Sequence, residues 1–210
     1  MKIAVILFNL GGPDKLENVE PFLFNLFNDP AILNLPSFIR YPLAKLISKR
    51  RAPIAKNIYK EIGGSSPILQ LTQEQADSLE KSLNNNEKSF NYKVFITMRC
   101  WHPRASETVK MVKDFNPSEI ILLPLYPQYS AATSGSSILE WKEIAKKNNL
   151  NIETSTICCY PEDDKFIKAA NNIQNLDVLS HNGLNVYDIV KKDNLIIIDE
   201  ALKLVEERLL

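Results

Sequence analysis

Short apolar runs bounded by turn residues recur along the chain. They span Ile3 to Phe8, Val94 to Met98, Ile120 to Leu125, Ile152 to Ile157 and Leu176 to Leu179. The runs are rich in Ile, Val and Leu and do not alternate with polar residues, which is typical of strands buried on both faces. The pattern therefore predicts strands of a mainly parallel sheet.

Segments with helical periodicity separate these runs. Thr72 and Gln75 fit a capping box ahead of an amphipathic stretch, and Ser137 with Glu140 repeats that spacing before a second one. Strands that alternate with helices predict an α/β fold, a Rossmann-like parallel sheet with flanking helices. In such a fold the ligand site is expected where loops leave the carboxyl ends of the strands.

Residues 17–62 interrupt this alternation. They carry Phe22, Phe24 and Phe27, followed by prolines among basic residues. A connection of this length is awkward in a compact domain unless it forms helices that cover a site. We therefore predict a helical segment and call residues 17–62 the lip.

Composition and charge exclude some classes of protein. The 210 residues are 45% hydrophobic and 24% charged, which suits a globular protein with a real core, and 25 basic residues balance 25 acidic ones. No dense positive field is available for phosphates, so nucleic acid is not an expected partner. The opening MKIAVILF is shorter than a secretory h-region, and no apolar run approaches the roughly 20 residues that span a bilayer. We expect a cytoplasmic protein.

Two glycine-containing loops follow predicted strands. FNLGGPD follows the first strand but lacks the third glycine of a dinucleotide fingerprint, and no Walker A loop is present, so a nucleotide-binding module is the weakest interpretation. LPLYPQYSAATSGSS, from residue 123, combines two tyrosines with five hydroxyl residues ahead of a helix. It offers donors and a helix N-terminus to an anionic ligand, and it equally fits a turn followed by a helix cap.

Basic and aromatic residues gather in two further segments. KRRAPIAKNIYKEIGGSSPI contains Arg50, Arg51 and Tyr59; these guanidinium groups suit carboxylates, although a solvated basic helix face would look the same. ITMRCWHP places Arg99 at the end of a strand, beside a tryptophan expected in the core and a histidine expected to be satisfied locally. Together these loops point to a flat apolar ligand that carries carboxylates.

Five segments carry a resemblance to a known family. FNLGGPD, LFNDPAIL, KRRAPIAKNIYKEIGGSSPI, MRCWHP and LYPQYSAATSGSS resemble, in this order, the signatures of ferrochelatase, a lyase-type enzyme of haem synthesis that inserts ferrous iron into a porphyrin. The resemblance covers residues 1 to about 170. It implies two Rossmann-like (chelatase-like) halves with the porphyrin between them: a first half over 1–170 that includes the lip, and the start of a second over 171–210.

The resemblance also implies a set of ligand contacts. By position, the porphyrin-contacting residues are Asn9, Arg50, Arg51, Tyr59, Ser66, Arg99, Tyr126, Tyr129 and Ser130. The arginines and hydroxyls are candidates for the propionates or for neighbouring contacts, and the aromatic residues for packing on the macrocycle. Fe²⁺ is expected as the substrate metal, and no resident cofactor is expected.

The metal-handling segment departs from the family pattern. The family's LFSAHGLP corresponds to VLSHNGLN here, and Gly183 falls in register only if Asn182, rather than His181, takes the histidine position. A shift of one residue at a strand end turns a side chain to the opposite face, and an amide cannot act as a base near neutral pH. His181 and Asn182 are the catalytic candidates, and His181 is the candidate metal ligand.

The resemblance weakens towards the end of the chain. The family's SEHxETL-like segment, which bears a catalytic glutamate, has no counterpart before Leu210, so we expect a C-terminally truncated chain with an incomplete second half-domain. Two functions stay open: insertion of iron into protoporphyrin IX or coproporphyrin III, and a catalytically compromised fragment that binds porphyrin. Peripheral contact with a membrane is a further expectation.

An incomplete half-domain leaves apolar surface without a partner, notably at Ile196, Ile198 and Leu202. We therefore expect the isolated chain to self-associate or to be poorly soluble. Size-exclusion chromatography tests this expectation, and a stable monomer with cooperative unfolding would refute it.

Overall fold

The computed structural model describes residues 1–86, 88–126 and 129–158. The elements are β1 (Lys2–Asn9), η1 (Leu16–Asn18), α1 (Val19–Phe27), α2 (Ser37–Glu61), α3 (Ile68–Asn86), β2 (Asn91–Met98), α4 (Ala105–Phe115), β3 (Glu119–Pro124), η2 (Ala131–Gly135), α5 (Ser136–Lys147) and β4 (Glu153–Thr156). The described residues form one compact unit, apart from Tyr129, which belongs to a second unit. The predicted boundary at residues 170 and 171 lies outside the described part.

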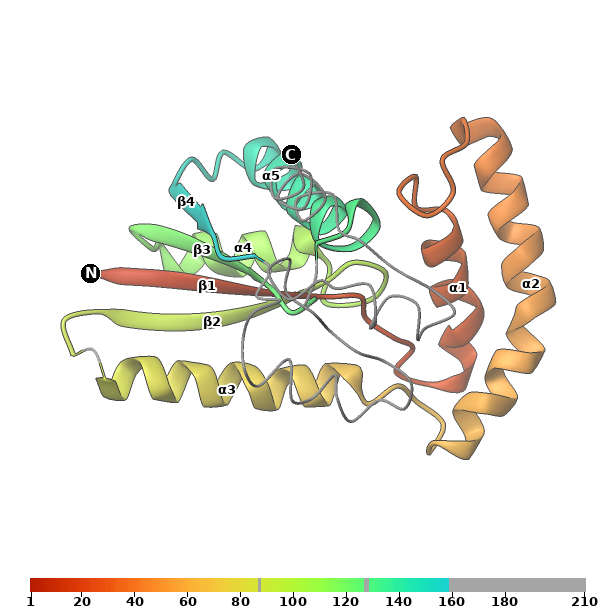
Figure 1. Cartoon of the computed structure of the whole chain (residues 1–210), viewed down its shortest axis with the longest axis horizontal. Helices are drawn as coiled ribbons and strands as arrows, with labels where there is room; N and C mark the ends of the chain where they lie inside the picture. Colours follow the sequence, from red (N-terminus) through yellow and green to blue (C-terminus); the bar gives the residue numbers. More distant parts are fainter. Residues whose placement is uncertain (87, 127–128, 159–210) are drawn as a thin grey trace, which may run out of the picture. The chain divides into compact units, whose positions relative to one another are not determined.

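The sheet has four strands in the order β2-β1-β3-β4, and every pairing is parallel (Figure 1). This confirms the predicted α/β class with a parallel sheet. Asn9 lies opposite Met98 of β2, and Phe8 lies opposite Pro124 of β3. The carboxyl ends of β1, β2 and β3 therefore meet at one edge of the sheet.

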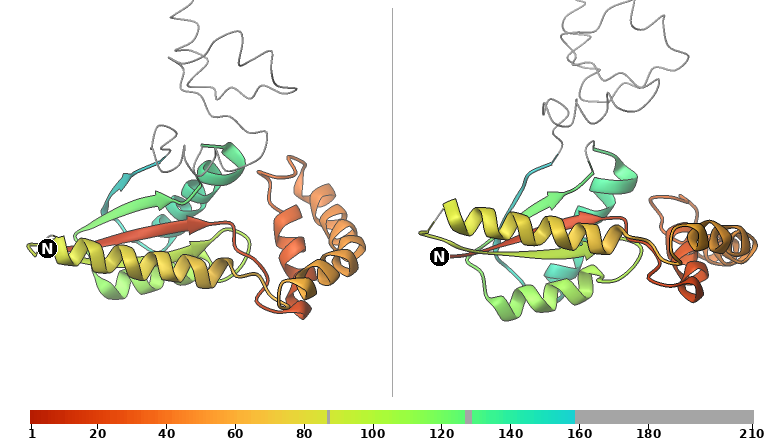
Figure 2. Two further views of the ribbon diagram at one scale, coloured as in Figure 1. Left: turned by 60° about the horizontal axis from the view of Figure 1, so that its bottom comes forward. Right: turned by 90° about the horizontal axis from the view of Figure 1, so that it is seen from below.

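Helices cover both faces of the sheet. Ala4, Ile6 and Phe8 of β1 pack in one cluster with residues of α4 and α5, and the intervening Val5 and Leu7 pack in another cluster with α3. Figure 2 shows α3 on one face and α4 on the other. Because neighbouring side chains of a strand point to opposite faces, a continuous apolar run is what this two-sided burial requires.

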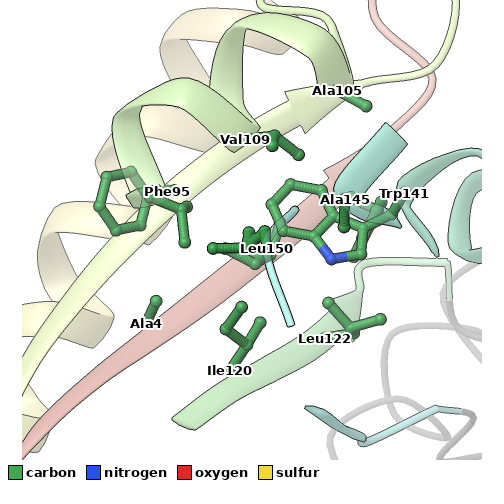
Figure 3. Packing of buried hydrophobic residues seen from close by; sticks show 12 residues of the cluster. Ala4, Phe95, Ala105, Val109, Ile120, Leu122, Trp141, Ala145 and Leu150 are labelled. Carbon is green, nitrogen blue, oxygen red and sulfur yellow. The ribbon is translucent and has the colours of Figure 1, made fainter. Parts of the chain in front are cut away.

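Trp141 of α5 is the largest fully buried side chain among the described residues. Its ring meets Phe8 edge to face, with centroids 6.0 Å apart and an interplanar angle of 87°. Figure 3 shows Val109 of α4 and Leu122 of β3 in the same cluster. This packing fixes α5 over the carboxyl half of β1.

β4 corrects one expectation. A strand does form within the run from Ile152 to Ile157, but it is only Glu153–Thr156, and all four of its residues are exposed. The residues that pair are polar, and the two isoleucines flank the strand, so it has no apolar faces to bury. The prediction of two-sided burial was wrong here, and the run at Leu176 to Leu179 lies outside the described residues.

The predicted helix caps were also wrong. α3 begins at Ile68, so Thr72 lies inside the helix, and its hydroxyl donates to the Ile68 carbonyl oxygen at 2.6 Å. Ser137 lies inside α5, which a short π-helix, η2, precedes. Ser130 caps that π-helix by accepting a hydrogen bond from the backbone N–H of Ala132 at 3.2 Å. In both cases the chain becomes helical before the residue that spacing selected.

The lip is helical, as predicted. It contains η1, α1 and α2, and α2 runs for 25 residues with Pro42 and Pro53 inside it. α1 and α2 bury an apolar cluster against Cys100 and Trp101, which follow β2. The two helices therefore lie beyond the carboxyl ends of the strands (Figure 1). Among the described residues, no helix is both long and apolar enough to cross a membrane.

Candidate functional site

Three predicted site residues meet where the central strands end. Asn9 closes β1, Arg99 follows β2, and Tyr126 follows β3. The backbone N–H of Arg99 donates to the carbonyl oxygen of Asn9 at 2.9 Å, and the N–H of Leu125 donates to the carbonyl oxygen of Phe8 at 3.0 Å. The sheet ladder thus continues one residue past each strand and holds these positions together.

The glycine pair after β1 brings Ser66 to the same edge. Gly11 has a φ of +85°, which disfavours any side chain, and it packs on Met98 and Trp101. A Cβ atom at Gly12 would collide with the Ser66 hydroxyl. The backbone N–H of Ser66 donates to the Pro13 carbonyl oxygen at 2.8 Å. Two segments far apart in the sequence are therefore in close contact here.

The Asn9 side chain is held at both ends. Its amide nitrogen donates to the Thr72 hydroxyl at 3.2 Å, and its amide oxygen accepts from the backbone N–H of Leu10 at 2.9 Å. These two bonds define which end of the amide is nitrogen. Asn9 therefore has a fixed orientation at the start of the glycine turn.

Arg99 is occupied by carboxylates of the protein itself. Its Nε and Nη2 atoms donate to Asp29 at 2.7 and 2.9 Å, and its Nη1 lies 2.8 Å from Glu140. Burial lowers the pKa of Arg99, but the two carboxylates outweigh it and raise that pKa overall. All three guanidinium nitrogens of Arg99 are therefore engaged by the protein. This geometry favours a role for Arg99 beside the residues that bind propionate over direct binding of a propionate.

Tyr126 is half-buried, and its hydroxyl is enclosed. Desolvation raises the pKa of Tyr126 from 10.0 to about 12, and the adjacent Ser137 hydroxyl offsets part of that rise. The two hydroxyls are close enough for Ser137 to act on that pKa, but neither makes a hydrogen bond of good geometry in the described structure, and the same holds for the buried Ser134 hydroxyl. The ring of Tyr126, rather than its hydroxyl, is the part that can meet a ligand.

The basic residues of α2 lie on its surface. Arg50 and Arg51 are exposed. Their position fits a solvated basic helix face, and it equally fits guanidinium groups that bind carboxylates. Tyr59 is half-buried against the Trp101 cluster, and desolvation raises its pKa. Ser130 is exposed at the start of η2. Tyr129 is 45% exposed and belongs to the second unit.

Two residues of the MRCWHP segment have local roles, as expected. Trp101 is 9% exposed, and its indole nitrogen donates to Asp14 at 3.1 Å. His102 is largely exposed, and its Nδ1 lies 2.7 Å from Glu107. The expectation of a core tryptophan and a locally satisfied histidine is confirmed.

The metal-handling candidates, His181 and Asn182, lie outside the described residues. Within the part that the structure does describe, no group of three or more His, Cys, Asp or Glu side chains is placed to hold a metal ion.

Sequence reasoning missed the acidic partners of the site. Asp29, Glu140 and Asp14 fix Arg99 and Trp101, and each comes from a different segment. An acidic residue beside a turn proline, as at Asp29, gives no signal of a partner 70 positions away.

Cys100 is a buried free thiol. Desolvation raises its pKa to about 11, so the thiol stays protonated near neutral pH.

The parallel sheet, its covering helices and the polar groups at its carboxyl edge define an α/β protein of the chelatase-like class. A family model described as Ferrochelatase matches residues 2–184. The chain belongs to the ferrochelatase family.

Curated relatives agree with this membership. The ferrochelatase of Pelagibacter ubique (strain HTCC1062) is 71% identical over 169 residues, which cover 80% of this chain and 49% of the relative. Ferrochelatases of Wolbachia sp. subsp. Drosophila simulans (strain wRi) and Rickettsia bellii (strain OSU 85-389) are 54% and 50% identical, over 82% and 80% of this chain and 55% and 46% of their own lengths. The chain spans about half the length of the curated relatives it matches.

Replacing Tyr126 with Phe tests the enclosed hydroxyl. Because this hydroxyl makes no hydrogen bond of good geometry, we expect the free energy of unfolding at pH 7 to rise or to change by less than about 1 kcal/mol. Between about pH 10 and pH 12 the unfolded tyrosine loses its proton and the folded one keeps it, so wild-type stability falls as pH rises. The variant should lose less stability over that range.

Urea unfolding at pH 7 and at pH 11 measures both effects. Tyr41→Phe, at a side chain that is 55% exposed, is the matched control. A loss of more than about 2 kcal/mol at pH 7 in Tyr126→Phe would show that the hydroxyl makes a stabilising bond after all.

Proposed function

We propose that this chain acts as a ferrochelatase, in the insertion of Fe²⁺ into a porphyrin to form haem, a lyase-type reaction. Family membership supports the proposal, as do relatives that carry the name ferrochelatase. The observation that carries it is the convergence of Asn9, Ser66, Arg99 and Tyr126 on one edge of the sheet, with the lip beside them.

The proposed ligand is flat and apolar and carries two propionates. Arg50 and Arg51 bind propionate as planar donors, because they are the exposed guanidinium groups of the set. The rings of Tyr59, Tyr126 and Tyr129 pack on the macrocycle. Ser66 and Ser130 supply hydroxyl contacts at the rim, while Asn9 and Arg99 hold the surrounding backbone in place.

The proposed chemistry removes two pyrrole protons while the nitrogens receive the metal. His181 is the proposed base and metal ligand, since a neutral imidazole serves either role near pH 7. Asn182 occupies the family's histidine position and takes up no proton there. Fe²⁺ is a substrate, and we propose no resident cofactor.

A second candidate function is a catalytically compromised fragment that binds porphyrin. The observation that favours it is the register of VLSHNGLN, which places an amide where the family has an imidazole. Protoporphyrin IX and coproporphyrin III are both candidate ligands under either proposal.

Porphyrin binding tests what the two proposals share. Titration of either porphyrin with the purified chain should shift the porphyrin absorption and fluorescence spectra. Replacing both Arg50 and Arg51 with Ala should raise the Kd by about tenfold or more, because two charge-assisted contacts are lost. Lys142→Ala with Lys146→Ala removes two exposed charges from α5 and should leave the Kd unchanged. Equal Kd values in all three proteins would refute the assigned role of the arginines.

Iron insertion separates the two proposals. In an anaerobic assay with Fe²⁺, a ferrochelatase converts the porphyrin, so free-porphyrin fluorescence falls above a no-enzyme control. His181→Ala should abolish that fall while leaving porphyrin binding intact. Binding without turnover in the wild-type chain would select the compromised fragment.

The lip also supports the proposed contact with a membrane surface. α2 exposes Phe38 (76%) and Ile54 (66%), and it carries seven Lys or Arg residues with Glu61 as its one acidic residue. Exposed apolar side chains among basic ones suit an anionic lipid surface.

The cytoplasmic location and the self-association expected from the sequence stay predictions.

Cosedimentation with vesicles of anionic lipid tests this contact. Replacing Phe38 and Ile54 with Ser should reduce the bound fraction several-fold, since two apolar side chains no longer contact the lipid. Leu139→Ser, at an α5 side chain that is 60% exposed, should not reduce it. Equal cosedimentation of wild type and the double variant would remove the lip from the proposal.

A further inference from the structure

Four charged side chains form an alternating row at the carboxyl edge of the sheet. Asp29 pairs with Arg99 through two bonds, Arg99 pairs with Glu140 at 2.8 Å, and Glu140 pairs with Arg104 at 3.0 Å. The exposed fractions of the Asp29, Arg99 and Glu140 side chains are 5%, 12% and 18%. A pair buried to this degree is costly to break, because the remaining charge stays desolvated without its partner.

Each carboxylate belongs to a different structural element. Asp29 lies in the connection between α1 and α2, inside the lip. Glu140 lies on α5, one turn after the two serines that begin this helix. Arg99 and Arg104 flank the short segment between β2 and α4. The row therefore ties the lip and α5 to the same strand end.

Asp29 also builds the connection in which it lies. Its Oδ1 accepts from the backbone N–H of Ala31 at 2.9 Å, in addition to Arg99. Its carbonyl oxygen accepts from the N–H groups of Ile32 and Leu33 at 3.0 and 2.9 Å. The conformation of residues 28–36 thus depends on an aspartate that is itself held by Arg99.

A second contact supports the same attachment. The Asn25 amide of α1 donates to the Cys100 carbonyl oxygen at 3.1 Å, directly after Arg99. Around it, Val19 and Phe22 of α1 pack on Cys100 and Trp101. The apolar cluster holds α1, whereas among the described residues Asp29 is the ion-paired anchor for the turn that leads into α2.

We propose that Asp29 and Glu140 are positioning residues of the porphyrin site, which act through Arg99. They fix the α1–α2 connection to the end of β2, and that connection sets the position of the α2 residues proposed above to bind the ligand. This inference rests on the proposed function, because it assigns Asp29 and Glu140 to the porphyrin site proposed above. Neither residue needs to touch the ligand.

The test compares wild type with Asp29→Asn and Glu140→Gln, which keep the side-chain shape and remove the charge. Glu143→Gln is the matched control, because Glu143 is an exposed carboxylate on the same helix as Glu140. Two quantities are measured on each 210-residue protein: the Kd for coproporphyrin III, and hydrogen–deuterium exchange resolved by peptide.

Asp29→Asn should raise amide exchange in residues 28–36 by about tenfold or more while β1 stays protected, and it should raise the Kd by about tenfold. Glu140→Gln should also raise the Kd, with a smaller increase of amide exchange in residues 28–36. Glu143→Gln should change neither quantity.

Two outcomes would count against the inference, and a third would count against the proposed function. Faster exchange throughout the chain, including β1, would assign Asp29 to global stability alone. Faster exchange in residues 28–36 with an unchanged Kd would show that the connection does not position the site. A wild-type chain that binds no porphyrin would overturn the proposed function; exchange confined to residues 28–36 in Asp29→Asn would then still support the anchoring step.

Discussion

Parallel pairing of β1 with both of its neighbours is the constraint on which the site depends. Because Asn9 lies opposite Met98 and Phe8 lies opposite Pro124, the three strands end together and their connecting segments leave from one edge. Parallel strands require crossovers, and α3 and α4 supply them on opposite faces. The glycine turn, the Arg99 segment and Tyr126 are neighbours for this reason.

The polar groups predicted for the site divide into two kinds. Asn9 and Arg99 are satisfied by the protein itself, through an amide held at both ends and a guanidinium bound by two carboxylates. Arg50 and Arg51 are exposed on the lip. A site that binds carboxylates needs both kinds, since a rigid frame lowers the entropic cost of binding and free donors provide the attraction. The proposed function uses each kind in its own role.

The sequence predicted the class of fold because the apolar runs of β1, β2 and β3 do not alternate with polar residues, and this pattern indicates strands of a buried parallel sheet. β4 differed because its paired residues are polar, and the apolar pattern came from Ile152 and Ile157 outside it. The caps at Thr72 and Ser137 differed because spacing alone does not reveal where a helix begins. The pairing of Arg99 with Asp29 depends on tertiary structure, so the sequence offered only the arginine.

Under the proposed function, a porphyrin lies across the carboxyl ends of β1, β2 and β3, beneath the lip. Hydrogen–deuterium exchange of the chain with and without coproporphyrin III tests it most directly. Porphyrin bound in this position should protect the segments around residues 9–14, 59–66 and 99–102, with exchange on the outer face of α3 unchanged. Protection on α3 or α4 alone, with none at the strand ends, would contradict it.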